Sequence, residues 1–407
     1  MKYIVILADG MADWPIESLN GKTPMAVANK PHINAMAGGG ITGLCQTVPE
    51  EFSPGSDVAN LSVLGYPPSQ FYKGRSSLEA ISAGVEIGPE DMTLRANLVT
   101  LSEEGASFED KILLDYSGGE ISTDAAHLLI ADVQKALNDD VMEIFPSVSF
   151  RNILRWHGGP MDTEFNPAHE IMDARIGDKL PQGSGREQAV NFMKKAHAIL
   201  KEHPYNKDKV AKGEKPANAL WLWGPGVKAE LPSFQERYGL KGGVVSGVDL
   251  IRGIGISAKM DILYLAAATG GVETDFHGKG DIAAAYLKGG GEFVFVHVEA
   301  PDESGHQGKL DKKISAIERI DQDTIPPIIE AVKTLGEDYR IMVMPDHATP
   351  LEIRTHSREP IPFMIFDSRY HQPSESFVHC EASAKAQNLL FPDGKSLLTK
   401  FLDPAYH

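Results

Sequence analysis

Five residues with side chains that bind metal ions follow or precede apolar segments in the last third of the chain: Asp302, His306, Asp346, His347 and His356. The segments FVFVHV (293–298), RIMVM (340–344) and IPFMIF (361–366) are typical of buried strands. Alpha/beta proteins bind ligands at the carboxyl ends of parallel strands, so these residues are expected to gather at one edge of a sheet. Each residue alone also fits an ordinary loop position. As a set they predict a site for two divalent cations, and Asp/His chemistry suits Mn²⁺ or Zn²⁺.

The first of these strands is expected to break at Ala300-Pro301, which would leave Asp302 and His306 in a loop. A helix-prone segment follows from Lys309.

Two further candidates lie near the N-terminus. Residues 3–8 (YIVILA) are predicted to form the first strand, and Asp9 stands at its end, although Asp9-Gly10 also fits a turn. Ser56 follows Pro54-Gly55 and begins an apolar-periodic run, which places it at or next to a helix N-terminus. Free backbone N–H groups and the helix dipole favour negative charge there, as a serine nucleophile and a phosphate require. Ser56 equally fits a helix N-cap, and the two roles are compatible.

Length and composition narrow the class of protein. A chain of 407 residues is expected to form two domains. The net charge of −17 argues against nucleic acid or an acidic membrane as a partner. The two cysteines, Cys45 and Cys380, form no disulfide framework and favour a reducing compartment. The apolar N-terminus is too short for a signal peptide, and no apolar run approaches the roughly 20 residues that span a bilayer. We therefore expect a cytoplasmic protein.

The order of predicted elements indicates one α/β domain built from residues 1–84 and 236–407, interrupted by a smaller inserted domain over 85–235 that would serve as a substrate-binding or lid domain. Within the insertion, strands are predicted near 92–101 and over 219–223, where Gly224-Pro225-Gly226 is expected to turn the chain. Six cationic or imidazole side chains are candidates for contact with an anionic substrate, although a surface role fits each of them: Arg75, Arg151, Arg155, His157, His169 and Arg252.

Several motifs together resemble a known family. After Asp9 come PGSDVANLSVLGY (54–66), DESGHQGKLDKKISAIERID (302–321), MPDHATP (344–350) and THSREPIPFMIF (355–366), in the order found in the alkaline phosphatase superfamily. The chain resembles more closely the 2,3-bisphosphoglycerate-independent phosphoglycerate mutases of the archaeal-type branch. GRSSLEAISAGVEI followed by LRANLVT also fits that branch.

The resemblance implies an alkaline-phosphatase-like three-layer α/β/α domain with a mostly parallel sheet, plus an inserted α+β domain. It implies that one cation is bound by Asp302, His306 and His356, and the other by Asp9, Ser56, Asp346 and His347. Ser56 would be the nucleophile that carries the phosphoryl group between 3-phosphoglycerate and 2-phosphoglycerate. Two divalent ions are expected, Mn²⁺ ahead of Zn²⁺ or Mg²⁺, with no need for 2,3-bisphosphoglycerate. The partner would be a small phosphorylated anion, and a homo-oligomer is compatible with the family.

One position departs from the family pattern. Trp223 stands where archaeal-type mutases commonly carry an arginine, and tryptophan cannot bind a phosphate or carboxylate bidentately. This departure keeps a second reading open, a homoserine kinase-type phosphotransferase or a phosphatase on the same two-metal core.

Overall fold

The computed structural model describes residues 1–374 and 377–407, and the chain divides into two units. The first unit contains Met1–Tyr72 and Glu230–His407, and the second contains Lys73–Ala229. The predicted boundaries differ slightly, because they assign residues 73–84 to the first domain and residues 230–235 to the inserted one. Residues 73–84 belong to the second unit because the helix α5 (Arg75–Ser82) packs on the strands of that unit.

The first unit is built on an eight-stranded sheet. In spatial order the strands are β13 (Leu390–Phe391), β2 (Ile41–Cys45), β12 (Ile361–Asp367), β11 (Tyr339–Met344), β1 (Lys2–Ala8), β10 (Phe293–Val298), β8 (Gly242–Val245) and β9 (Asp261–Ile262). Five of the seven neighbouring pairs are parallel, and β12 runs antiparallel to both β11 and β2. The central strands β11, β1 and β10 are buried along their whole length, as their continuous apolar sequences predict.

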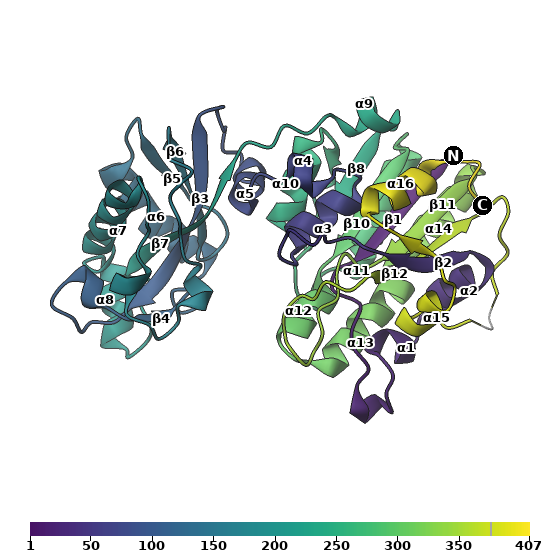
Figure 1. Ribbon diagram of the computed structural model, residues 1–407, viewed down its shortest axis with the longest axis horizontal. Coiled ribbons are helices and arrows are strands. Elements are labelled where there is room, and N and C mark those ends of the chain that lie inside the picture. The colour runs from purple at the N-terminus through teal and green to yellow at the C-terminus, as the bar shows by residue number, and fades with distance from the viewer. Residues whose placement is uncertain (375–376) are drawn as a thin grey trace. The chain divides into compact units, whose positions relative to one another are not determined.

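Helices cover both faces of this sheet, so the predicted three-layer α/β/α architecture is confirmed (Figure 1). On one face lie α2 (Pro31–Gly39), α11 (Phe276–Lys288), α13 (Leu310–Arg319) and α14 (Ile325–Leu335). Alternate residues such as Ile4 and Val294 join these helices in one core. On the other face lie α3 (Ser56–Val63), α10 (Asp249–Ser257) and α16 (Gly394–Leu402), where Phe401 packs against Tyr3 with ring centroids 5.7 Å apart.

The shorter helices of the first unit lie at the edges of this framework and are α1 (Pro24–Val27), α4 (Pro68–Phe71), α9 (Phe234–Tyr238), α12 (Ala300–His306) and α15 (Glu381–Lys385).

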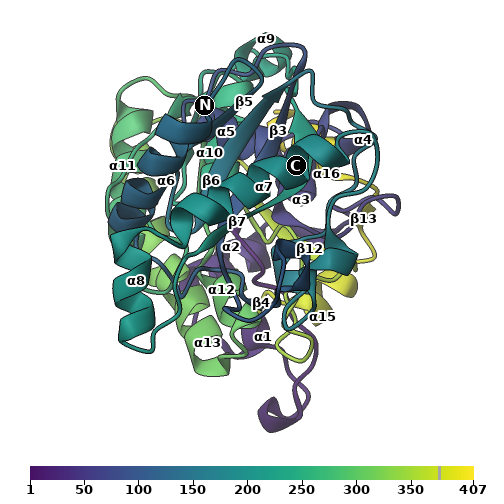
Figure 2. The same ribbon diagram turned by 90° about the vertical axis from the view of Figure 1, so that its left-hand side faces the viewer.

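The second unit is an antiparallel sheet with helices on both faces. Its strands are β4 (Leu113–Asp115), β3 (Asp91–Leu101), β6 (Arg151–His157) and β5 (Met142–Phe145), with β7 (Ala219–Val227) paired to β3. The helices α6 (Thr123–Leu137) and α7 (Arg186–Leu200) lie side by side over one face (Figure 2), and α8 (Pro204–Ala211) follows α7. On the other face α5 is fixed by Ser76, whose hydroxyl donates to the Thr93 carbonyl at 2.9 Å.

Two local expectations are corrected. The predicted loop after β10 is the helix α12, because Pro301 lies in its first turn, where proline's missing N–H costs no hydrogen bond. The expected turn at Gly224-Pro225-Gly226 lies inside β7, which stays paired to β3 from Ala219 to Val227 with a register shift. Gly224 has a φ of +64°, so glycine absorbs the irregularity without ending the strand.

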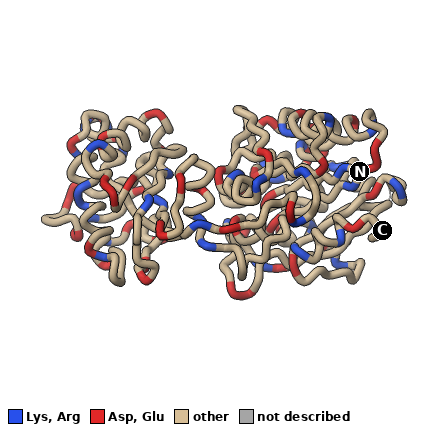
Figure 3. The backbone as a smooth tube through the Cα atoms, turned by 90° about the horizontal axis from the view of Figure 1, so that it is seen from above, with Lys and Arg blue, Asp and Glu red and all other residues tan. Residues whose placement is uncertain are grey.

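Charged residues of both signs are distributed over each unit. Figure 3 shows Lys and Arg interspersed with Asp and Glu along the backbone. Within residues 1–374 and 377–407, the helices are all too short or too polar to cross a membrane.

Candidate metal centre

The sheet of the first unit brings the predicted ligands to one edge. Asp9 follows β1, Asp302 lies in α12 directly after β10, and Asp346 follows β11. These three strands are parallel neighbours, so their carboxyl ends coincide. His356 precedes β12, and because β12 runs antiparallel, its beginning lies at the same edge.

The gathered side chains form two groups that share His347. One group is Asp302, His347 and His356, and the other is Asp9, Asp346 and His347; in each, the ligand atoms lie within 4.8 Å of one another. His306 joins the first group: its Nε2 lies 3.2 Å from Asp302 Oδ2 and 3.0 Å from His356 Nε2.

Ser56 lies against the shared histidine. It is the first residue of α3, and Gly55 occupies the N-cap position, so the alternative that Ser56 is the cap is wrong. The side chain is buried, and its Oγ lies 3.1 Å from His347 Nε2. The serine hydroxyl is therefore at a helix N-terminus and beside both groups of carboxylates and imidazoles.

Supporting residues that the sequence did not single out hold these side chains in place. The Asn60 amide donates to the Ser56 carbonyl and to Asp346 Oδ2, each at 2.8 Å. The Thr349 hydroxyl donates to Asp302 Oδ1. Asn60 lies one helical turn after Ser56, a spacing that puts both on one face of a helix and is the signal that could have identified it.

The donor set fits divalent cations. Asp9 Oδ1 is buried and has no hydrogen-bond partner among the described residues. The Nε2 atoms of His306 and His356 face each other at 3.0 Å beside the Asp302 carboxylate. Carboxylate oxygens and imidazole nitrogens converging from several elements are what a transition-metal or zinc site requires.

The charges in the centre perturb one another strongly. Burial, with the charges of Asp346 and Asp302, raises the pKa of Asp9 well above its usual range. Burial also favours neutral Asp302, but the imidazoles of His306 and His356 outweigh it and hold the pKa of Asp302 well below its usual range. Burial alone would lower the pKa of His306, yet the hydrogen bond and charge of Asp302 raise it to about 9.

A pH dependence of cation binding follows. Because the pKa of His306 is about 9, a cation that binds through this imidazole would displace a proton at neutral pH. The affinity for Mn²⁺ should therefore rise with pH, by about tenfold per unit below pH 9 for this one proton, and level off above it. Isothermal titration calorimetry between about pH 6 and pH 9 measures the slope, and the variant His306→Gln should bind more weakly with a shallower slope. An affinity independent of pH in the native protein would contradict the prediction.

The predicted substrate contacts of the second unit are spread over its α5 face. Arg75 Nε lies 2.9 Å from Glu79 Oε1, and the Arg151 guanidinium lies 4.8 Å from the Phe150 ring centroid. Arg155 pairs with Glu143.

The remaining three candidates differ in their surroundings. His157 Nδ1 lies 3.0 Å from Asp91 Oδ1, and the His169 ring lies 5.4 Å from that of Trp223. Arg252 lies in the first unit, and its Nε donates to the Ser246 carbonyl at 2.9 Å. Arg75, Arg155 and His157 are thus each engaged with carboxylates of their own unit.

Trp223, which stands where the family commonly has an arginine, lies against an arginine from another strand. Arg95 of β3 stacks its guanidinium 4.5 Å from the centroid of the Trp223 ring. Glu79 holds this guanidinium through two hydrogen bonds of 2.7 and 2.9 Å. The Trp223 indole N–H donates to Asn97 Oδ1 at 3.1 Å. A buried arginine from a neighbouring strand therefore lies directly against the tryptophan.

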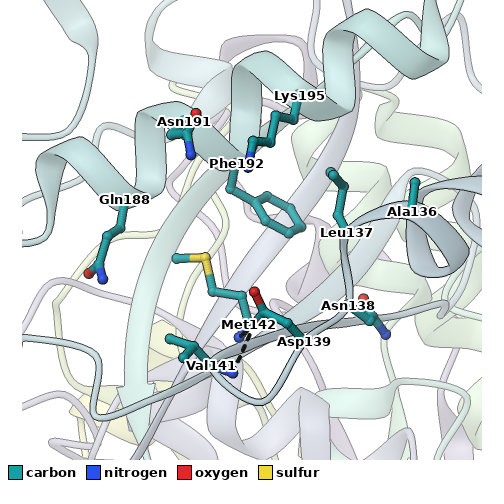
Figure 4. A pocket seen from close by; sticks show the side chains of 10 residues that line it. All are labelled: Ala136, Leu137, Asn138, Asp139, Val141, Met142, Gln188, Asn191, Phe192 and Lys195. Atoms are coloured by element: carbon teal, nitrogen blue, oxygen red, sulfur yellow. Dashed lines mark hydrogen bonds between the residues drawn. The ribbon is translucent and has the colours of Figure 1, made fainter.

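The second unit also contains a hollow of about 320 Å³ between the end of α6, β5 and α7 (Figure 4). The residues that line it are Ala136, Leu137, Asn138, Asp139, Val141, Met142, Gln188, Asn191, Phe192 and Lys195. Its one carboxylate, Asp139, already accepts the backbone N–H groups of Val141 and Met142. The predicted site residues are not among its lining.

Comparison with known proteins places the chain in a family. A family model of 2,3-bisphosphoglycerate-independent phosphoglycerate mutase matches residues 37–206. A protein from Geobacter sulfurreducens named a probable 2,3-bisphosphoglycerate-independent phosphoglycerate mutase is 41% identical over 403 residues, which cover 99% of this chain and 100% of that protein. A protein from Methanothrix thermoacetophila with the same family name is 42% identical over 368 residues, which cover 90% of this chain and 91% of that protein.

Solved structures share the fold. A protein from Pyrococcus horikoshii superposes with a TM-score of 0.81 at 27% identity, covering 99% of this chain and 96% of its own. A cofactor-independent phosphoglycerate mutase from Thermoplasma acidophilum superposes with a TM-score of 0.62 at 22% identity, covering 98% of each chain. From its relatives of about 40% identity over nearly their full length, the chain belongs to the family of 2,3-bisphosphoglycerate-independent phosphoglycerate mutases.

Proposed function

We propose that the protein interconverts 3-phosphoglycerate and 2-phosphoglycerate by passing the phosphoryl group through Ser56. The proposal rests on one observation: Ser56 Oγ lies at the N-terminus of α3, 3.1 Å from the histidine that the two ligand groups share. The names of the relatives, which specify this mutase and its independence from 2,3-bisphosphoglycerate, support the choice of substrate.

The residues would hold two divalent cations, for which Mn²⁺ is the first choice because the ligands mix carboxylates and imidazoles. Asp302, His306 and His356 would bind one ion, and Asp9, Ser56, Asp346 and His347 the other. When bound, the ions would neutralise charge on the phosphoryl group and lower the pKa of the Ser56 hydroxyl.

The chain's own groups perform the transfer in two displacements. Ser56 Oγ loses its proton and bonds to phosphorus while the bond from phosphorus to O3 of 3-phosphoglycerate breaks, and O3 takes up a proton. The glycerate stays bound, and its 2-hydroxyl loses a proton and attacks the phosphoserine. The bond from phosphorus to Ser56 Oγ then breaks, and the serine regains its proton. The positive end of α3 stabilises the negative charge on the serine oxygen in both steps.

The inserted unit, Lys73–Ala229, is the proposed substrate-binding unit. Arg75 and Arg151 on its α5 face are the proposed contacts to the anionic groups of the substrate, because guanidinium forks match carboxylates and phosphates.

An enolase-coupled assay with 3-phosphoglycerate and Mn²⁺ tests the function. We expect 2-phosphoglycerate to form at a rate that added 2,3-bisphosphoglycerate does not change. Failure of Mn²⁺-loaded protein to form 2-phosphoglycerate would overturn the proposal.

A further inference from the structure

A histidine that has no assigned role lies behind Asp9. His297 is the fifth residue of β10 and is fully buried within an otherwise apolar strand. The neighbouring strands β1, β10 and β8 end at the same edge and bring Asp9, His297 and Ser246 into a row. His297 Nε2 lies 2.8 Å from Asp9 Oδ2, and its Nδ1 lies 3.2 Å from Ser246 Oγ.

The contacts in this row set the direction of one hydrogen bond. An Asp9 carboxylate that binds a cation is ionised and can only accept, so His297 donates to Asp9 Oδ2 from Nε2. On the other side of the ring, His297 Nδ1 contacts Ser246 Oγ, which also accepts the backbone N–H of Val248 at 3.0 Å.

The hydrogen bond from His297 leaves the two oxygens of the Asp9 carboxylate in different surroundings. Oδ2 is bound by His297, whereas Oδ1 is buried, lacks a hydrogen-bond partner in the described part of the chain and lies 3.6 Å from His347 Nε2. The hydrogen bond from His297 orients the carboxylate and leaves Oδ1 directed at the ligand groups.

The backbone of His297 is also fixed. The ammonium of buried Lys279 donates to the His297 carbonyl at 2.8 Å. The imidazole thus has a bonding partner on each ring nitrogen and a constrained main chain, which leaves it one orientation.

We infer that His297, held by Ser246, is a positioning residue that presents Asp9 Oδ1 to a divalent cation and thereby sets the affinity of one of the two cation positions. The inference rests on the proposed function in one respect, the role of Asp9 as a ligand. Hydrogen-bonding partners behind metal ligands typically change metal affinity by about 10- to 100-fold when removed.

Mn²⁺ titration of the full-length, metal-depleted protein, with free Mn²⁺ followed by electron paramagnetic resonance, tests it without any assay of activity. The native protein should bind two ions. In His297→Leu one of the two affinities should fall by about 10- to 100-fold while the other stays unchanged. His297→Gln, whose amide can donate to Asp9, should recover much of the loss, and Ser246→Ala should weaken the same position by a smaller factor.

The chain offers a matched control. His379 is also fully buried in the first unit, but its ring nitrogens have no hydrogen-bond partner among the described residues. His379→Leu should leave both Mn²⁺ affinities at the native values.

Several outcomes would overturn the inference. The inference is wrong if folded His297→Leu binds both Mn²⁺ ions with the affinities of the native protein, or if the variant loses affinity equally at both positions. It is also wrong if the native protein binds fewer than two Mn²⁺ ions. If His297→Leu does not fold, Ser246→Ala decides, and two native affinities in that variant count against the inference. A native protein that binds two ions, depends on His297 and yet forms no 2-phosphoglycerate would refute the mutase proposal and leave this inference standing.

Discussion

Replacing Ser56 with alanine should lower the mutase rate by about 10⁴-fold or more, because removal of a covalent nucleophile leaves only binding and electrostatic effects. The side chain is buried beside His347, and the loss of one hydroxyl leaves no large cavity. The enolase-coupled assay gives the rate. Intact mass after rapid quenching with 3-phosphoglycerate should show a phosphoryl adduct on the native protein and none on the variant.

Ser62 provides the control on the same helix. Its hydroxyl accepts the backbone N–H of Gly394 at 3.1 Å, and among the described residues no hydrogen bond joins it to the ligand groups. Ser62→Ala should therefore keep mutase activity and the adduct. Native rates in Ser56→Ala would show that the phosphoryl group does not pass through this serine.

The apolar pattern of the strands explains why the candidate ligands near Ser56 could be predicted from the sequence. Buried parallel strands have continuous apolar sequences, so Asp9 and Asp346 stand out as the first polar residues after β1 and β11. Because parallel strands align their carboxyl ends, the sequence alone predicts that residues more than three hundred positions apart lie at one edge.

Other features needed the three-dimensional register. The direction of β12, which puts His356 at the same edge, depends on pairing with β11 and β2 and is not encoded in its apolar pattern. The contact between His297 and Asp9 depends on the register of β1 and β10. In that register Leu7 lies opposite His297, so Asp9 follows two residues later, just after the neighbouring strand.

The candidate substrate contacts show the same limit. The pairing of Arg155 with Glu143 arises across the β5–β6 ladder, where the two residues are directly opposite. Charge alone made Arg155 a candidate, and cross-strand neighbours determine what that charge binds.

Replacing Asp346 with asparagine should lower the number of bound Mn²⁺ ions from two to one and the mutase rate by at least about 10³-fold, since each cation contributes several kcal/mol of transition-state stabilisation. Asp346 Oδ1 accepts the backbone N–H groups of Gly10 and His347, and an amide oxygen can keep both bonds. Its Oδ2 accepts from Asn60, whose own Oδ1 is buried without a hydrogen-bond partner in the described structure. The new amide group loses the hydrogen bond from Asn60, but the side chain keeps its size and both bonds of Oδ1, so the variant should fold with a somewhat lower melting temperature.

Asp367→Asn is the control variant, because it removes a buried carboxylate charge without removing a candidate metal ligand. It is fully buried in the same sheet and pairs with Arg340, with Arg340 Nε 3.1 Å from Asp367 Oδ2, away from the ligand groups. Asp367→Asn should lower the melting temperature, because it leaves Arg340 buried without its counter-ion, yet it should still bind two ions and stay active below that temperature. Metal analysis by mass spectrometry after Mn²⁺ loading, with the coupled assay, distinguishes the two variants. Two ions in folded Asp346→Asn would remove Asp346 from the ligand set, because an amide in place of a carboxylate should not hold the cation as tightly.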